Sequence, residues 1–149
     1  MPAQPIPPAS PAHCPSGQCP DCHAHAAIHA LVAAYSDAVN RRDADSWAAC
    51  WAPDAVWRLR GAEVAGRDQI LAAWRRAMDG FAQVWFMAFI GHLDLAGDEA
   101  RLRTHTFEYL NTATGKPRLQ SGLYEDHVIL RDGRWLFASR SFSSQELPL

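Results

Sequence analysis

The sequence predicts an α+β domain in which helices come first along the chain and an antiparallel sheet follows. In the first half, apolar residues recur at the spacing of an amphipathic helix. In the second half, four long segments alternate apolar and polar residues and are separated by turn-forming residues. One antiparallel sheet covered by helices accommodates both patterns within 149 residues, the length of a single domain.

Three helices are expected before the sheet. The first begins near Ala24 and carries an apolar stripe: Ile28, Leu31, Val32, Tyr35 and Val39. Asp43 or Asp45 can cap a short second helix, which Pro53 ends. The third occupies 67–79 and lies between two glycines.

The sheet is expected to contain one short strand and a meander of four longer ones. Their ranges are 55–60, 84–95, 100–110, 119–130 and 134–142. The last two are joined by Asp132 and Gly133. An Asp-Gly pair between two alternating runs is a strong signal for a hairpin.

Composition and charge exclude several classes of partner. Residues of the AVILMFWYC set make up 48% of the chain, and the formal net charge is −2 without any run of Lys or Arg. We therefore expect no nucleic-acid partner. No apolar stretch approaches the roughly 18 residues of a membrane span, so no membrane partner is expected. The first residues lack the charged and apolar regions of a secretory signal, which predicts a cytoplasmic location.

Residues 1–24 are expected to form a Pro- and Cys-rich arm that precedes a folded domain at 25–149. Seven of the ten prolines lie within the first 20 residues. Each proline fixes φ and removes a backbone donor, which disfavours regular structure. We therefore expect the arm to be extended and to lie outside the core.

Thiols and imidazoles gather in this arm, and the predicted zinc ligands are Cys14, Cys19, Cys22 and His23. The Cys-x-x-Cys spacing brings two thiolates to one ion. The Cys-x-x-Cys-His order also matches c-type haem attachment, but that linkage is made outside the cytoplasm. A redox pair and thiols that serve no site are the remaining alternatives.

Six short segments are informative in combination: Tyr35–Asp43, Trp51–Trp57, Gly66–Ile70, Gly97–Ala100, Gly122–Asp126 and Asp132–Trp135. In this order and spacing they resemble the SnoaL-like branch of the nuclear-transport-factor-like superfamily. The resemblance covers about 28–142. It implies a cone-shaped fold in which a strongly bent antiparallel sheet wraps a pocket covered by three N-terminal helices.

Members of this superfamily include ketosteroid isomerases, scytalone dehydratases and polyketide cyclases, so the fold alone does not decide the function. The resemblance implies chemistry without a cofactor on a small, hydrophobic, cyclic molecule. It also implies assembly as a homodimer or homotrimer.

Two positions depart from the acid–base pair of the dehydratase-like members. The family histidine lies on the strand that begins near Val84 here, and its matching position is Ala88. The family aspartate lies near the end of the first helix, and its match is Asn40. Neither alanine nor asparagine can transfer a proton. Tyr35, in contrast, matches a tyrosine found in several dehydratases.

The same matching predicts which other side chains face the pocket, because strand side chains alternate between two faces. His92 shares the inward face with Ala88 only if no bulge intervenes. The predicted catalytic residues are Tyr35, His92, Glu108 and Tyr124. The predicted substrate-binding residues are Asn40, Trp57, Leu59, Ala88, Thr106 and Asp126.

These residues suggest a specific chemistry. Burial would raise the pKa of the Glu108 carboxyl and suit it to proton abstraction near neutral pH. A buried tyrosine hydroxyl can stabilise an enolate oxygen. We therefore predict a lyase or isomerase of the dehydratase, isomerase or cyclase type. A non-catalytic binding protein and a module that self-associates through the outer face of the sheet are the alternatives.

Structural roles remain open for the same residues. Tyr35 could fill the core, and His92 could be a surface histidine. A register slip of one residue would turn Glu108 to solvent. Tyr124 and Asp126 could pair with Arg140 in a structural network.

Overall fold

The computed structural model describes residues 19–148, which form three helices and six strands. The helices are α1 (Pro20–Arg41), α2 (Ala44–Ala48) and α3 (Arg67–Asp79). The strands are β1 (Trp51–Leu59), β2 (Ala62–Ala65), β3 (Gln83–Ala96), β4 (Glu99–Asn111), β5 (Arg118–Arg131) and β6 (Arg134–Leu147). The α+β class, the three helices and the four-stranded meander are confirmed.

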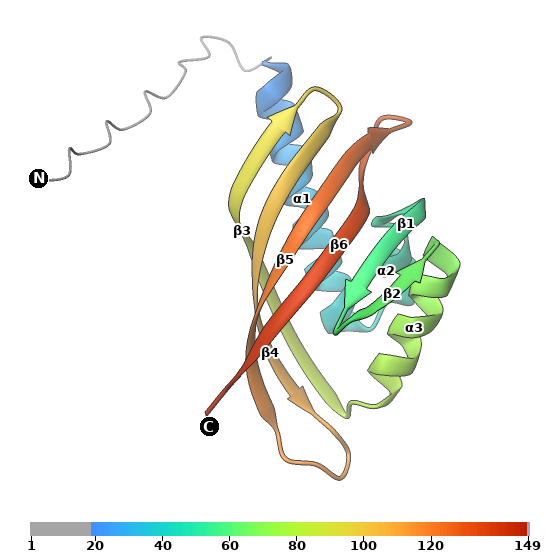
Figure 1. Ribbon diagram of the computed structural model, residues 1–149, viewed down its shortest axis with the longest axis vertical. Helices are drawn as coiled ribbons and strands as arrows, with labels where there is room; N and C mark the ends of the chain where they lie inside the picture. Colours follow the sequence, from blue (N-terminus) through green and yellow to red (C-terminus); the bar gives the residue numbers. More distant parts are fainter. Residues whose placement is uncertain (1–18, 149) are drawn as a thin grey trace, which may run out of the picture.

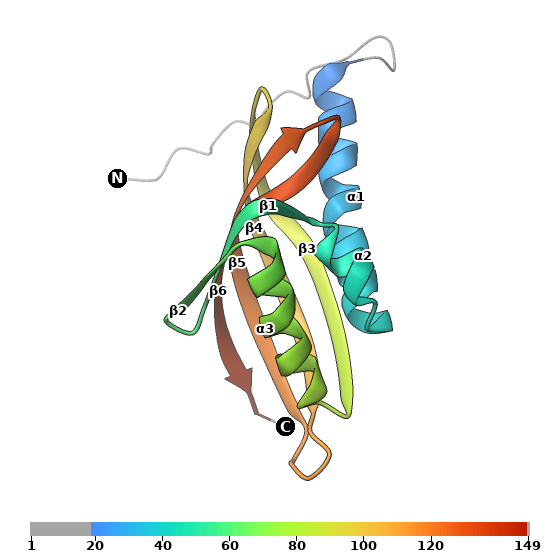
Figure 2. The same ribbon diagram turned by 90° about the vertical axis from the view of Figure 1, so that its right-hand side faces the viewer.

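All six strands belong to one sheet in the order β2-β1-β6-β5-β4-β3. The neighbouring strands are antiparallel except for β1 and β6, which are parallel. The sheet bends strongly, and the three helices lie on its concave side (Figures 1 and 2). This is the expected cone.

Some element boundaries differ from the expected ones. Helix α1 begins at Pro20 rather than near Ala24, because proline suits the first helical turn, where its missing N–H would have no partner. The prediction that Pro53 ends a helix is wrong, since β1 already begins at Trp51. Pro53 lies where the register between β1 and β6 shifts, and there it interrupts no regular ladder. Strand β2 was not predicted.

The core lies between α1 and the sheet. All five residues of the predicted apolar stripe on α1 are buried. Helix α2, capped by Asp43, contributes Trp47, whose ring stacks on Trp74 of α3 with centroids 4.8 Å apart. This contact fixes α3 relative to α2. At the end of α1, the Arg42 guanidinium donates hydrogen bonds to the carbonyl oxygens of Met78 and Phe81, which holds the other end of α3.

A buried ion pair joins β5 to β6 inside the cone. Arg140 Nε lies 2.7 Å from Asp126 Oδ1, and Thr104 donates a 2.8 Å hydrogen bond to the same carboxylate. The guanidinium also lies against aromatic rings, 3.7 Å from the ring centroid of Tyr124 and 4.4 Å from that of Tyr35. It therefore links α1 to two strands.

Removing either partner of this pair would leave an uncompensated charge in the interior. We expect Arg140→Met and Asp126→Leu each to lower the free energy of unfolding by about 3–5 kcal/mol. The double variant should lose less than the sum of the two, because no isolated charge remains. Urea denaturation of the four proteins measures this, and strictly additive losses would contradict the account.

Candidate functional site

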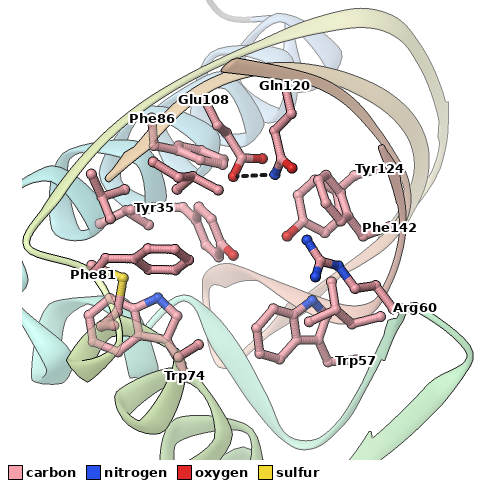
Figure 3. A pocket seen from close by; sticks show the side chains of 16 residues that line it. Tyr35, Trp57, Arg60, Trp74, Phe81, Phe86, Glu108, Gln120, Tyr124 and Phe142 are labelled. Atoms are coloured by element: carbon pink, nitrogen blue, oxygen red, sulfur yellow. Dashed lines mark hydrogen bonds between the residues drawn. The ribbon is translucent and has the colours of Figure 1, made fainter. Parts of the chain in front are cut away.

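A cavity of about 200 Å³ lies between the concave face of the sheet and helices α1 and α3. Most of its wall is apolar. The apolar lining residues are Val39, Trp57, Leu59, Trp74, Ala77, Met78, Phe81, Val84, Phe86, Leu110 and Phe142. Five polar side chains share this cavity: Tyr35, Arg60, Glu108, Gln120 and Tyr124 (Figure 3). Three of the four predicted catalytic residues are therefore brought together.

Glu108 is the carboxylate of this cavity, and only 9% of its surface is exposed. Its Oε1 atom accepts a hydrogen bond from Thr106 Oγ1 at 3.2 Å, and Oε2 accepts one from Gln120 Nε2 at 3.1 Å. Gly122 makes room for this arrangement, since a Cβ there would lie 2.4 Å from Thr106 Oγ1. Both carboxylate oxygens are thus held by neutral partners.

Burial raises the pKa of Glu108 above the ordinary range, while the hydrogen bonds from Gln120 and Thr106 and the charge of Arg60 act in the opposite direction. A carboxylate with a raised pKa is a stronger base than an exposed one. At neutral pH it combines this basicity with access to the cavity.

The hydroxyl groups of Tyr35 and Tyr124 point toward the centre of the same cavity (Figure 3). Burial raises the pKa of Tyr35, and it raises that of Tyr124 further, although the nearby Arg140 cation lowers both. Both phenols therefore stay protonated at neutral pH. They can serve as hydrogen-bond donors to an oxygen atom of a ligand.

Sequence reasoning missed Arg60 and Gln120. Gln120 lies directly across from Glu108 in the β4–β5 register, and it lies on the inward face at an even spacing from Tyr124. The alternation along β5 could therefore have identified it. Arg60 lies in the two-residue turn between β1 and β2, directly after Leu59. Leu59 was predicted to line the pocket, but the prediction ended with the strand and did not extend to the turn.

His92 does not reach the cavity. The pairing of β3 with β4 shifts between Ile90 and His92, because Gly91 is an extra residue in β3. The bulge reverses the alternation, so that His92 is exposed on the outer face. A Cβ at position 91 would lie 2.6 Å from the exposed His105 ring, so a larger residue there would require that ring to move. His92 was predicted to face inward only if no bulge intervened. A bulge is present, so that prediction is wrong.

Asn40 and Ala88 do not line the cavity either. Asn40 Nδ2 donates to the carbonyl oxygen of Phe86, and its Oδ1 accepts from the Phe86 N–H, both at 2.8 Å. Since β3 is an edge strand, Asn40 satisfies backbone groups that β4 cannot reach. Ala88 is half-buried and packs against the core.

The remaining predicted substrate-binding residues divide into two groups. Trp57 and Leu59 line the cavity. Thr106 and Asp126 face inward but are engaged by protein groups, Thr106 with Glu108 and Asp126 with Arg140. Of the alternatives considered for Asp126, the structural pair with Arg140 is the one observed.

Three of the four predicted zinc ligands lie at the start of α1. Cys14 lies outside the described residues. Cys19 is the N-cap of α1, and Cys22 and His23 follow in its first turns. Within 19–148, no group of three or more His, Cys, Asp or Glu side chains is arranged to hold a metal ion.

A family model described as a SnoaL-like domain matches residues 20–141, which include every residue that lines the cavity except Phe142. The chain belongs to the SnoaL-like family. No curated protein matches its sequence significantly. Among the helices within 19–148, none is long and apolar enough to cross a membrane.

Solved structures share the fold over most of the chain. A hexachlorocyclohexane dehydrochlorinase, LinA-type3 from Novosphingobium barchaimii, is 20% identical, with a TM-score of 0.78 over 87% of this chain and 92% of that one. A candidate scytalone dehydratase from Novosphingobium aromaticivorans is 18% identical, with a TM-score of 0.77 over 87% and 91%. A protein of unknown function from Mycobacterium tuberculosis is 26% identical, with a TM-score of 0.74 over 83% and 77%.

The raised pKa of Glu108 makes stability depend on pH. The folded state binds the proton more tightly than the unfolded state, so this carboxyl contributes fully below its unfolded pKa and its contribution is lost as pH rises through the folded pKa. Glutamine does not titrate, so Glu108→Gln does not lose stability in this way. We therefore expect the difference in melting temperature, variant minus unmodified protein, to increase from about pH 4 to about pH 8.

Differential scanning fluorimetry across this range measures the effect. Glu125→Gln is the control, because Glu125 is exposed on the outer face of the sheet. A melting-temperature difference for Glu108→Gln that stays constant or decreases with pH would contradict the assignment.

Proposed function

We propose that the protein is an acid–base enzyme of the dehydratase, isomerase or cyclase type, acting without a cofactor on a small hydrophobic molecule that contains a ring. The observation that carries this proposal is the Glu108 carboxyl, held in an apolar cavity beside two protonated phenols. An apolar cavity with a few convergent polar groups and a perturbed pKa is the usual form of a small-molecule site.

In the proposed reaction, Glu108 removes a proton from a carbon atom next to a carbonyl group of the substrate. Tyr35 and Tyr124 donate hydrogen bonds to the carbonyl oxygen as negative charge develops on it. The protonated Glu108 then returns the proton to another carbon in an isomerisation, or donates it to a departing hydroxyl group in a dehydration. Gln120 and Thr106 orient the carboxylate, and His92 has no part in this scheme.

The relatives support the reaction class but not its details. The proteins named a dehydrochlorinase and a candidate dehydratase take their names from eliminations. An elimination includes the removal of a proton from carbon, which is the step proposed for Glu108. Their identities below 25% support a shared fold, and the choice of base here rests on Glu108 itself.

A non-catalytic binding protein of the same fold is the alternative function. The observation that favours it is the presence of Asn40 and Ala88 where the dehydratase-like members carry their aspartate and histidine. Asn40 in addition uses both polar atoms on the backbone of β3. A binding protein would need the cavity but not the basicity of Glu108.

The two functions predict different results for Glu108→Gln. Candidate substrates come from thermal-shift screening and from mass spectrometry of compounds that co-purify with the protein. For an enzyme, we expect Glu108→Gln to lower turnover by about 10²–10⁴-fold while ligand binding persists. Glu125→Gln is the matched control. Unchanged turnover in Glu108→Gln would eliminate Glu108 as the base.

We also propose that the chain self-associates as a homodimer or homotrimer through the outer face of the sheet. Trp85, Met87 and Phe89 alternate along that face of β3 with 58%, 60% and 63% of their surfaces exposed, and Phe107 lies opposite Met87 on β4. Contiguous exposed apolar side chains of this size favour an interface.

Light scattering coupled to size-exclusion chromatography tests this assembly. We expect a dimeric or trimeric mass for the unmodified protein and a monomeric mass for Phe89→Lys, because burial of a lysine there is unfavourable. Gln69→Lys, an exposed position on α3 away from the outer face of the sheet, should leave the mass unchanged. A monomeric unmodified protein would contradict the proposal.

Two further proposals rest on the sequence alone. The first is zinc binding by Cys14, Cys19, Cys22 and His23. The second is a cytoplasmic location.

A further inference from the structure

The turn between β1 and β2 contains an unusual residue. It has two residues, Arg60 with φ 50° and Gly61 with φ 79°. Turns of this form favour Asn-Gly or Asp-Gly, because both central residues must have positive φ. The β5–β6 turn follows that rule with Asp132 and Gly133 at φ 51° and 74°. An arginine in this conformation is uncommon and suggests a function for its side chain.

The Arg60 side chain lies at the cavity, and no carboxylate among residues 19–148 is in direct contact with it. Arg60 lines both the cavity and a surface groove, and Gln120 and Phe142 also line both. The guanidinium therefore lies where the cavity opens. No ion pair or hydrogen bond within 19–148 involves this side chain. Its charge acts on Glu108 only through space.

A second donor faces the same space. Trp57 has 5% of its surface exposed, and its Nε1–H group is buried without a hydrogen-bond partner among the described residues. Trp47 and Trp51 are also unpaired in this way, but neither lines the cavity. Figure 3 shows the indole nitrogen of Trp57 directed into the cavity beside the Arg60 guanidinium. A buried donor without an acceptor is unfavourable unless a ligand supplies one.

We propose that the cavity binds a small carboxylic acid with a single ring, whose carboxylate accepts hydrogen bonds from Arg60 and from the Trp57 indole. A planar guanidinium matches a carboxylate with two parallel hydrogen bonds, which a neutral carbonyl compound cannot form. The ring of the acid lies among the apolar residues deeper in the cavity, including Val39, Met78 and Val84.

The size of the cavity matches a ligand with one ring. Its volume is about 200 Å³, below the ~300–1,000 Å³ that is typical of sites for drug-sized ligands. An apolar cavity of about 150 Å³ accommodates benzene. One ring with a short acidic substituent therefore fits inside the cavity, whereas a fused multi-ring molecule would extend through its mouth.

This inference rests on the proposed function for the place of the ligand, and it adds the ligand's chemical class. Glu108 and Gln120 lie across the cavity from Trp57 (Figure 3). An acid anchored by Arg60 thus directs its ring, or a carbon beside the ring, toward the base. The carboxylate of the ligand stays at the mouth, away from the Glu108 carboxylate.

Three pairs of probes test the inference by isothermal titration calorimetry: benzoate and benzamide, phenylacetate and phenylacetamide, and cyclohexanecarboxylate and cyclohexanecarboxamide. In each pair the amide keeps the shape and removes the charge. We expect at least one acid to bind about ten- to a hundredfold more tightly than its amide. If the acid binds no better than its amide in each of the three pairs, the inference is overturned.

Arg60→Asn is the decisive variant, because asparagine suits the backbone conformation of this turn and the variant should fold at least as well. It should remove the preference for the acid, whereas Arg60→Lys should retain part of it. Arg76→Gln, an exposed position on α3 outside the cavity lining, is the control and should retain all of it. A preference that survives Arg60→Asn would overturn the inference.

The binding assay is independent of turnover. Glu108→Gln should keep the preference for the acid, since it leaves Arg60 and Trp57 in place. A preference for acids without any turnover would contradict the proposed enzymatic function and support acid binding. Turnover of a neutral ligand without a preference for acids would support the enzymatic function and overturn acid binding.

Discussion

The Glu108 carboxyl lies inside an apolar cavity, and much of the surrounding structure accommodates that placement. An isolated carboxylate in such surroundings is strongly disfavoured, because it loses its hydration. Thr106 and Gln120 compensate with one hydrogen bond to each oxygen, and the charge of Arg60 favours the ionised form. This compensation is partial, since the pKa remains raised. Partial compensation is what leaves the group able to act as a base near neutral pH.

A comparison with Asp126 explains why only one of the two buried acids is a candidate for catalysis. Both lie on the inward face, on neighbouring strands. Asp126 forms two hydrogen bonds with Arg140 and one with Thr104, so its charge is neutralised and its oxygens are occupied. Glu108 has neutral hydrogen-bond partners and borders the cavity. The ion pair therefore belongs to the scaffold, and through its contacts with the rings of Tyr35 and Tyr124 it positions the two phenols of the site.

Much of this arrangement could be predicted from strand alternation and from resemblance to the SnoaL-like family. The helical stripe placed Tyr35 inside, and the alternation in β4 and β5 placed Glu108 and Tyr124 on one face. Alternation failed at His92, because Gly91 adds one residue to β3 and reverses the faces of the residues beyond it. An isolated glycine inside a strand is a signal of such a bulge, and the strict alternation assumed for this strand did not use it. Arg60 was missed for a related reason. Strand alternation places Leu59 at the cavity, but it says nothing about the direction of a side chain in the turn that follows.

The most direct test of the central claim is a carbon-13 NMR titration of the Glu108 side-chain carboxyl, with Glu108→Gln used to assign its resonance. The account predicts a titration midpoint above about 4.2, the mean value for glutamate in folded proteins. A midpoint at or below this value would mean that the carboxyl is as well solvated as a surface group, or is fully compensated by its partners. It would contradict the assignment of Glu108 as the base in an apolar cavity.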